Sequence, residues 1–514
     1  MGAAASTAAA VNRRVCAHRL FGEMPLGEGD TGAAPPAAGC EGIDVLPDGV
    51  LAHILGFLPA EEAVRTSVLA RRWRHLWKSA TSLHVVAADG HFLGSVDKLV
   101  EFMDRLLPLR EGASLDTCNL HLGDFSSEVR WHYFQVSDAE EDVLCRIDAW
   151  FRQVATCRVR FLRLVVCCEK ECGGCPLHGL FDLPLVSRHL KRLELRGVKL
   201  GSSLLDFSSC PVLEHLVFEW RDLSDAASTI SFQSLKHLNM TSCMLKWDSR
   251  ICIDAPNLAS FRLDNFAQMT PMLESMPLLV DAFVNITRFC GDQCNQLWHE
   301  YCDCEFCVSS ESIGDDNSSS VLLKGLSEAE NLTLVSEPIM FIFRMDLRWC
   351  PTFSKLKNLL LNEYWCVPDD FHALACILEH SPLLEKLTLQ LFSKGPAHKV
   401  QLKGSINPRL RCASISEHLK TVEVMCEVVD EWILKVLKFL RMFNLFHPSC
   451  FNISDLCHVR ENKKISCINR SEMLPLTVWI FCCRLLLLSR GARKSDLSWM
   501  NCMVEVNCNT FDIV

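Results

Sequence analysis

The sequence predicts a mixed α/β chain in which a short module of three helices precedes a solenoid. The solenoid would be a curved sheet whose convex side is helical or irregular. Apolar residues recur at helical spacing within residues 43–79, and a leucine pattern recurs in steps of 23, 22 and 23 residues from Leu190 to Leu258. With 514 residues, 49% of them hydrophobic, the chain is long enough for two or more domains with a large core.

Residues 1–42 are rich in alanine, glycine and proline and lack apolar periodicity, so we expect a flexible leader. Its first residues, MGAAAS, fit the pattern for N-myristoylation at Gly2, and a leader without acylation is the alternative. It lacks the features of a secretory signal peptide, and the 29 cysteines, an odd number, cannot all pair within the chain. We therefore expect a nuclear or cytoplasmic protein with mostly free thiols.

The segment 43–79 predicts three short helices. Pro47 suits the first turn of the first helix, and Pro59 ends that helix and opens the second. Glu61 and Glu62 follow in the first turn of the second helix, where the helix dipole favours anions. The first helix presents one wide apolar face, formed by Val50, Leu51, Ile54, Leu55 and Leu58.

The third helix, within LARRWRHLWKS (69–79), combines tryptophans with basic residues. At helical spacing Leu69, Trp73, Leu76 and Trp77 share one stripe, so we expect the tryptophans to be packing groups. Its arginines would form the rim of that stripe. The formal net charge of the chain is −10, whereas nucleic-acid-binding proteins usually carry a basic surplus, so no nucleic-acid partner is predicted.

Residues 43–79 resemble an F-box, through the Leu46–Pro47 opening, the segment VLAHILGFLP, and VLARRWRHLW, which is similar to the plant form of the motif. The resemblance implies an F-box over residues 43–83 that docks onto a Skp-type adaptor and, through it, a cullin. It assigns these residues to the adaptor interface: Leu46, Pro47, Val50, Leu51, Ile54, Leu55 and Leu58. A second set would share that interface or lock the three helices together: Val64, Val68, Leu69, Trp73 and Trp77. The alternative is that all of these are core residues.

Four segments share the pattern L-x-x-L/F-x-L/M/F: HLKRLEL (189–195), VLEHLVF (212–218), SLKHLNM (234–240) and NLASFRL (257–263). Looser copies are NLTL (331–334), KLKNLLL (355–361), LLEKLTL (383–389) and HLKTVEV (418–424). A period in the twenties with this pattern is typical of leucine-rich repeats, in which each unit buries its leucines against its neighbours. We expect a repeat domain over residues 84–416.

The positions between the buried leucines would line the concave face and offer a surface to a protein substrate. The predicted substrate-binding residues are Lys191, Glu194, Glu214, His215, Lys236, His237, Arg262, Lys357, Glu385 and Lys386. The alternative is that they are solvated charges without a ligand.

A cysteine-rich segment falls where the repeat pattern breaks, in an irregular loop at about residues 288–320. Its weak metal candidates have spacings compatible with zinc: Cys290, Cys294, His299, Cys302, Cys304 and Cys307. A second, weaker group comprises Cys167, Cys168, Cys172, Cys175 and His178. A surface loop with free thiols is the simpler interpretation, so no cofactor is predicted.

Residues 417–446 predict a strand followed by a helix that carries Trp432, Ile433, Val436, Leu437 and Leu440 on one face. This segment resembles the start of the FBD domain of plant F-box proteins, and residues 371–392 resemble the helix–strand unit before it. Residues 447–514 depart from that family pattern. Within them, Leu474–Ser489 is apolar but too short to span a membrane and contains Arg484, so no membrane partner is predicted.

No phosphate-binding loop, H-E-x-x-H or G-x-S-x-G motif is present, so we do not expect an enzyme. The resemblance implies a substrate-recognition subunit of a Skp–cullin–F-box ubiquitin ligase, whose repeats hold a protein substrate. The alternative is a leucine-rich-repeat interaction scaffold that does not associate with a ligase, with a C-terminus that impairs its folding. A metal protein or enzyme built on the cysteine clusters is a third hypothesis.

Overall fold

The computed structural model describes residues 46–87, 96–122, 138–166, 178–179, 183–203, 205–220, 222–292, 321–337, 340, 342–347, 350–366, 371–392, 418–426, 431–442 and 464–466. The predicted leader, with Gly2, and almost all of the predicted tail lie outside these residues. Across the described ranges, no helix combines the length and apolarity that crossing a membrane requires.

The first described elements form the helical module, residues 46–80. Its elements are α2 (Asp48–Leu55), α3 (Ala60–Arg65), and the 3₁₀ helices η2 (Thr66–Val68), η3 (Arg71–Arg74) and η4 (Leu76–Ser79). The first two predicted helices are confirmed, but the third prediction is wrong, because 3₁₀ turns replace one continuous α-helix. Ala70 has extended backbone, with φ −158° and ψ 162°, which interrupts the helical path. Leu69 therefore leaves the predicted stripe and is 69% exposed, whereas Trp73 and Trp77 are buried.

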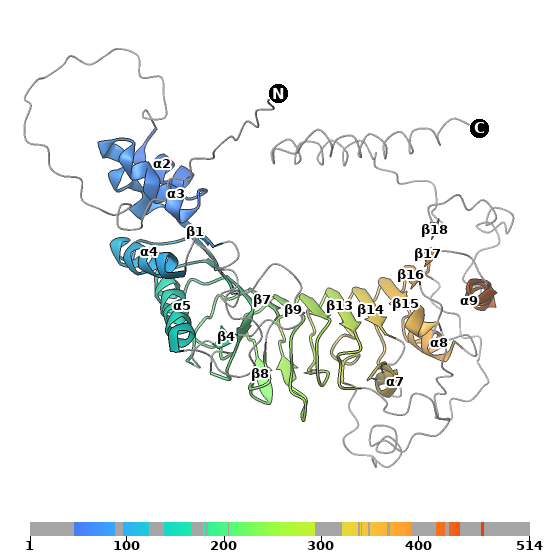
Figure 1. The fold of residues 1–514 in the computed structure, drawn as a ribbon. Helices are drawn as coiled ribbons and strands as arrows, with labels where there is room; N and C mark the ends of the chain where they lie inside the picture. The colour runs from blue at the N-terminus through green and yellow to red at the C-terminus, as the bar shows by residue number, and fades with distance from the viewer. Residues whose placement is uncertain are drawn as a thin grey trace, which may run out of the picture. The chain divides into compact units, whose positions relative to one another are not determined.

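A sheet of 13 strands follows, and Figure 1 shows its strands side by side in chain order. Its strands are β1 (Ser82–Val86), β2 (Thr117–His121), β3 (Phe161–Val165), β5 (Arg192–Arg196), β7 (His215–Glu219), β9 (His237–Thr241), β11 (Ser260–Asp264), β13 (Asp281–Ile286), β14 (Asn331–Ser336), β15 (Asn358–Asn362), β16 (Lys386–Leu391), β17 (Thr421–Cys426) and β18 (Lys464–Ser466). Neighbouring strands from β1 to β17 pair in parallel. The chain is thus a mixed α/β protein with an open, largely parallel sheet.

All eight leucine-patterned segments become strands of this sheet, which confirms their predicted positions. Strands β1, β2, β3 and β13 belong to the same sheet but were not identified as copies of the pattern. Two of them bury small side chains where the pattern has leucine, namely Cys118 in β2 and Ala282 in β13. The parallel register, rather than leucine itself, is the property that these strands share.

The connections between strands differ along the sheet. Helices lie near its two ends: α4 (Val96–Leu109), α5 (Asp138–Thr156), α7 (Ile342–Leu347), α8 (His372–Glu379) and α9 (Glu431–Met442), with the 3₁₀ helix η8 (Glu363–Trp365) after β15. The middle connections carry short strands instead: β4 (His178–Gly179), β6 (Val198–Lys199), β8 (Thr229–Ser231), β10 (Cys252–Asp254) and β12 (Met272–Leu273). Strands β8, β10 and β12 form a small parallel sheet.

The predicted strand and helix within 417–446 are confirmed as β17 and α9. Ile433, Val436 and Leu440 are buried, and Trp432 and Leu437 pack against the same core while partly exposed. The predicted helix–strand unit within 371–392 is likewise present, as α8 and β16.

The strands from β1 to β17 bury alternate side chains along most of their length. In β9, Leu238 and Met240 are buried and lie in register with Leu216 and Phe218 of β7. A fully buried side chain of this size stabilises the fold by about 1.5–3 kcal/mol. The backbone repeats as well: the carbonyl of Lys191 accepts from the amides of Glu214 at 2.9 Å and His215 at 3.0 Å, and equivalent pairs recur along the sheet. Each unit thus completes the hydrogen bonds of the one before it.

Candidate binding surfaces

Five of the residues predicted to face the adaptor are buried in the interior of the helical module. These are Leu51, Leu55, Val64, Trp73 and Trp77, each at most 6% exposed. They join the apolar core that continues into the sheet. In this structure the five side chains lock the helices together, which is the second of the two roles considered for Val64, Trp73 and Trp77.

The outside of the module carries large apolar side chains. Val50 is 43% exposed, and Val68 and Leu69 are each 69% exposed. Pro47 is exposed, and Leu46, Ile54 and Leu58 are half-buried. Phe57 was not among the predicted residues, yet it is 71% exposed and follows Val50 and Ile54 at helical spacing. This helical spacing in the sequence could have identified Phe57 as a surface residue. We call Val50, Ile54, Phe57, Val68 and Leu69 the module surface.

Arg72 fixes the start of the module. Its Nε donates to Oδ1 of Asp48 at 2.7 Å, and its guanidinium also donates to the backbone carbonyl of Leu46. The Leu46–Pro47 opening, which precedes α2, is thereby tied to a residue 26 positions later in the chain. Arg71 and Arg74 are exposed, in agreement with a basic rim around the module.

One flank of the module rests on the sheet. Arg110, itself buried, donates to the carbonyls of Trp77 at 3.0 Å and Ala80 at 2.6 Å. Pro59 forms a parallel bridge with His84 of β1, so the module sits at the first edge of the sheet. The sheet covers this flank, and the module surface remains exposed.

The second candidate surface is the face of the sheet opposite the buried leucines, which we call the open face. Five predicted substrate-binding residues lie on it at the alternate, unburied positions of strands: Glu194, His215, His237, Arg262 and Lys386. The other five each directly precede a strand: Lys191, Glu214, Lys236, Lys357 and Glu385. The parallel register therefore gathers both groups into rows across the sheet.

Charges along the row before the strands pair with one another. The Nζ of Lys236 lies 2.8 Å from Oε1 of Glu214, that of Lys357 lies 2.7 Å from Oε2 of Glu330, and Lys420 pairs with Glu385 at 2.8 Å. These ion pairs are exposed, so each contributes little to stability. They give this edge of the sheet alternating charges.

The open face also carries stacked rings. The imidazoles of His215 and His237 lie 4.3 Å apart and within 1° of parallel. Burial, followed by the charge of His237, lowers the pKa of His215, which favours its neutral form. The guanidinium of Arg262 lies 3.7 Å from the ring centre of Phe283 on the next strand. Aromatic residues and arginine are enriched at protein–protein interfaces.

The cysteine-rich segment is described only in part. Cys290 is fully buried, and its sulfur lies 3.3 Å from the hydroxyl oxygen of Thr270. Burial and the neighbouring Asp292 raise the pKa of its thiol to about 12. Cys294, His299, Cys302, Cys304 and Cys307 lie outside the described residues, as do Cys167, Cys168, Cys172 and Cys175. The zinc hypothesis for these segments therefore stays a prediction.

Comparison with known proteins gives one domain match and several relatives. The F-box domain family matches residues 43–84. An FBD-associated F-box protein of Arabidopsis thaliana is 30% identical over 262 residues, which cover 48% of this chain and 61% of that protein. An F-box/FBD/LRR-repeat protein of the same plant is 25% identical over 419 residues, covering 76% and 84%. An Arabidopsis F-box protein is 30% identical over 262 residues, covering 47% and 79%.

Proposed function

Because the chain belongs to the plant family of F-box proteins with FBD and leucine-rich-repeat regions, we propose that it is the substrate-recognition subunit of a Skp–cullin–F-box ubiquitin ligase. The matches identify an F-box adaptor-type protein. In the proposal, the helical module binds a Skp-type adaptor, which connects it to a cullin, and the open face binds a protein substrate. The chain itself is not catalytic, and it acts in the nucleus or the cytoplasm.

The observation that carries the proposal is the exposure of the module surface. Phe57, Val68 and Leu69 are each about 70% exposed, within 13 residues of sequence. Isolated apolar side chains on a surface are ordinary, but several large ones on a single small module are typical of an interface. We assign the adaptor contact to the module surface together with Leu46, Pro47 and Leu58. Leu51, Leu55, Val64, Trp73 and Trp77 support that surface from beneath.

We assign the repeat region to a leucine-rich-repeat solenoid over residues 84–416, continued by a partial FBD-like unit at 417–446. Support comes from the leucine pattern, the parallel register and the repeated pairing of two amides to one carbonyl. The predicted leader at 1–42, the irregular loop at about 288–320 and the tail at 447–514 complete the proposed organisation.

The mechanism is proximity. When the open face binds a substrate and the module surface binds the ligase, both are held in one complex, so ubiquitin is transferred within that complex. The transfer then depends on effective concentration rather than on chance encounter. No residue of this chain needs to take part in the chemistry, which would lie on the other subunits.

The adaptor contact is tested by co-purification from plant cells. Wild-type protein should retain the Skp-type adaptor and the cullin, and the double variant Leu46→Ala, Pro47→Ala should lose both while its far-ultraviolet circular dichroism stays unchanged. Val186→Ala is the matched control, because Val186 is 63% exposed but lies outside the module. If the double variant retains the adaptor at the wild-type level, the chain is better described as a repeat scaffold without a ligase.

The substrate contact is tested separately, after proteasome inhibition. Reversing two charges of the open face, with Glu194→Lys and Arg262→Glu, should leave adaptor binding intact and reduce the ubiquitin conjugates that co-purify. Conjugates at the wild-type level would place substrate recognition elsewhere in the chain.

A further inference from the structure

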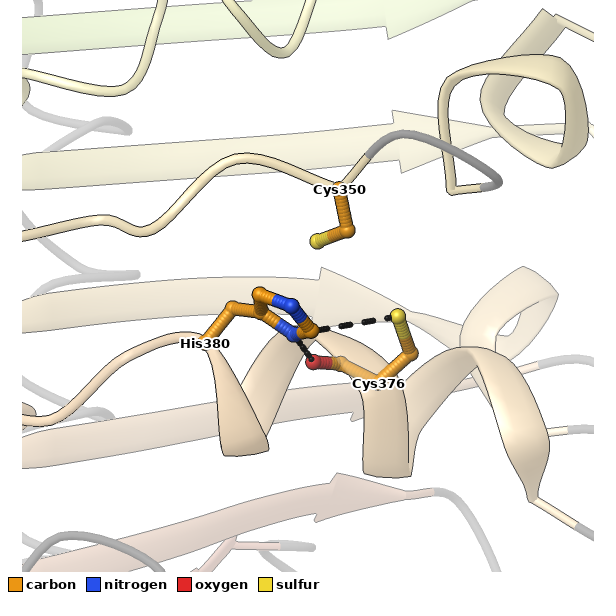
Figure 2. A group of neighbouring side chains, drawn as sticks. All are labelled: Cys350, Cys376 and His380. Atoms are coloured by element: carbon orange, nitrogen blue, oxygen red, sulfur yellow. Dashed lines mark hydrogen bonds between the residues drawn. The ribbon is translucent and has the colours of Figure 1, made fainter. Parts of the chain in front are cut away.

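Two thiols and one imidazole meet where the β14–β15 connection contacts the β15–β16 connection, away from both binding surfaces. They belong to Cys350, Cys376 and His380, and one ligand atom from each lies within 4.8 Å of the other two. Figure 2 shows the three side chains directed toward one another. All three are half-buried, so an ion from solvent can reach them.

Separate structural units supply these side chains. Cys350 lies between α7 and β15, whereas Cys376 is on α8 and His380 caps that helix. The spacing of four residues puts Cys376 and His380 on one side of the helix. The amide of Phe353 donates to the carbonyl of His380 at 2.8 Å, which holds the segment carrying Cys350 against the end of α8. The backbone therefore fixes the cluster without help from the thiols.

The hydrogen bonds within the cluster leave ligand atoms available. The sulfur of Cys376 lies 4.0 Å from Nδ1 of His380 and 3.9 Å from the carbonyl of Leu347, and that of Cys350 lies 3.7 Å from the carbonyl of Pro351. These contacts are long and weak. His380 Nδ1 lies 2.8 Å from the carbonyl of Cys376. A carbonyl can only accept, so Nδ1 carries a proton in this contact, and Nε2, once it is deprotonated, is the ring nitrogen left to bind a metal.

We propose that Cys350, Cys376 and His380 bind one zinc ion. Two thiolates and an imidazole form a soft donor set that suits Zn²⁺ far better than Mg²⁺ or Ca²⁺. Around a tetrahedral zinc, two sulfurs lie about 3.8 Å apart and sulfur and nitrogen about 3.5 Å apart. The ligand atoms, which lie within 4.8 Å of one another, must approach by about 1.3 Å at most, a change of the size that side-chain rotation allows. Water would take the fourth position.

The ion would join two consecutive units of the sheet. Cys350 lies in the connection before β15, and Cys376 lies in the connection before β16. A shared ion would therefore cross-link the connections of two neighbouring strands that the sheet already pairs. This role is structural and is independent of the proposed ligase function. It also differs from the zinc hypothesis for residues 290–307, because it uses other ligands.

Cobalt titration of the full-length protein tests the site. Metal-free protein, kept reduced, is titrated with Co²⁺ alone, and thiolate-to-cobalt charge-transfer absorption is recorded and then displaced with Zn²⁺. Cys350→Ser, Cys376→Ser and His380→Gln should each bind about one equivalent less than wild type. Cys145→Ser, a half-buried free cysteine on α5, is the control and should bind as much as wild type. Equal absorption in all of these proteins would overturn the proposal.

Alkylation of the unmutated protein gives a readout that does not depend on any variant folding. In the presence of Zn²⁺, peptide mass spectrometry should find Cys350 and Cys376 modified by iodoacetamide more slowly than after chelation, with Cys145 unaffected. Unchanged rates at both cysteines would contradict the proposal. So would a disulfide between Cys350 and Cys376 in protein whose thiols were blocked at lysis, because an oxidised pair cannot supply the two thiolates.

Discussion

The sheet and the helical module handle apolar surface in opposite ways. In β9, Leu238 and Met240 are buried because the strands on either side repeat the same spacing. In the module, Leu51 and Leu55 are buried, but Val50 and Phe57 of the same segment stay exposed. Strands such as β9 thus bury their apolar residues against neighbouring strands, whereas the module buries only those on the flank that faces its own core.

The outer faces differ in kind as well. The open face of the sheet carries paired charges and stacked rings, such as Lys236 with Glu214 and His215 with His237. The module surface is apolar with a basic rim. Two surfaces of different chemistry suit the two different partners that the proposed bridging function requires.

The largest expected difference in stability is between a variant in the interior of the module and a variant on its surface. Trp77→Ala should lower the free energy of unfolding by about 3–5 kcal/mol, because it empties a buried site, whereas Leu69→Ala should change it by no more than about 0.5 kcal/mol. Urea unfolding followed by circular dichroism measures both. Similar losses for the two variants would mean that Leu69 is packed in solution and that the module surface is wrongly assigned.

The next effect concerns a buried ion pair in the sheet region. The carboxylate of Asp292 is fully buried and pairs with the guanidinium of Arg250, and the backbone amide of Thr270 donates to it at 2.9 Å. Asp292→Asn should cost about 2–3 kcal/mol, because it leaves the charge of Arg250 unpaired in a half-buried position. Unfolding of the variant at neutral pH checks the value, and a loss near zero would contradict the geometry.

The same pair predicts a pH dependence. Burial alone would raise the pKa of Asp292, but hydrogen bonds and the charge of Arg250 outweigh it and hold the pKa below its ordinary range. Its stabilisation is therefore complete above about pH 4 and is lost as the pH falls through the folded pKa. Between neutral and acid pH, wild type should lose more stability than Asp292→Asn. Parallel acid profiles would contradict this assignment.

The smallest effect belongs to an exposed ion pair in the module. Arg72 and Asp48 are 34% and 66% exposed, and solvent screens their attraction. Arg72→Ala should therefore cost about 1 kcal/mol, including the hydrogen bond to the Leu46 carbonyl. Thermal unfolding measures this loss. A loss as large as that of Asp292→Asn would remove the contrast between the buried and the exposed pair.

Much of the fold could be predicted from the sequence, because repetition makes local patterns agree with the tertiary structure. Each leucine-patterned segment became a strand beside its neighbour, and the helix at 431–442 appeared where Ile433 and Val436 indicated it. The prediction was wrong at Leu69, where spacing alone could not reveal the extended backbone of Ala70. Spacing also could not show that Val50 is exposed and Leu51 buried, since both belong to the same apolar face in the sequence.

The candidate zinc site was missed for a related reason. Cys376 and His380 show helical spacing, but Cys350 lies 26 residues earlier in the sequence. Only the pairing of β15 with β16 brings it to the end of α8. Close ligand spacing in the sequence pointed to residues 290–307 instead, where most of the candidates lie outside the described residues.

The most direct test of the account is a calorimetric titration of the purified full-length protein with a purified plant Skp-type adaptor. We predict that wild type binds and that Phe57→Ala with Leu69→Ala weakens the affinity by about tenfold or more, since exposed apolar anchors carry much of the binding energy of such an interface. Glu194→Lys with Arg262→Glu on the open face should bind as wild type does. Equal affinity of the wild type and the Phe57, Leu69 variant would contradict the central claim that the module surface is the adaptor site.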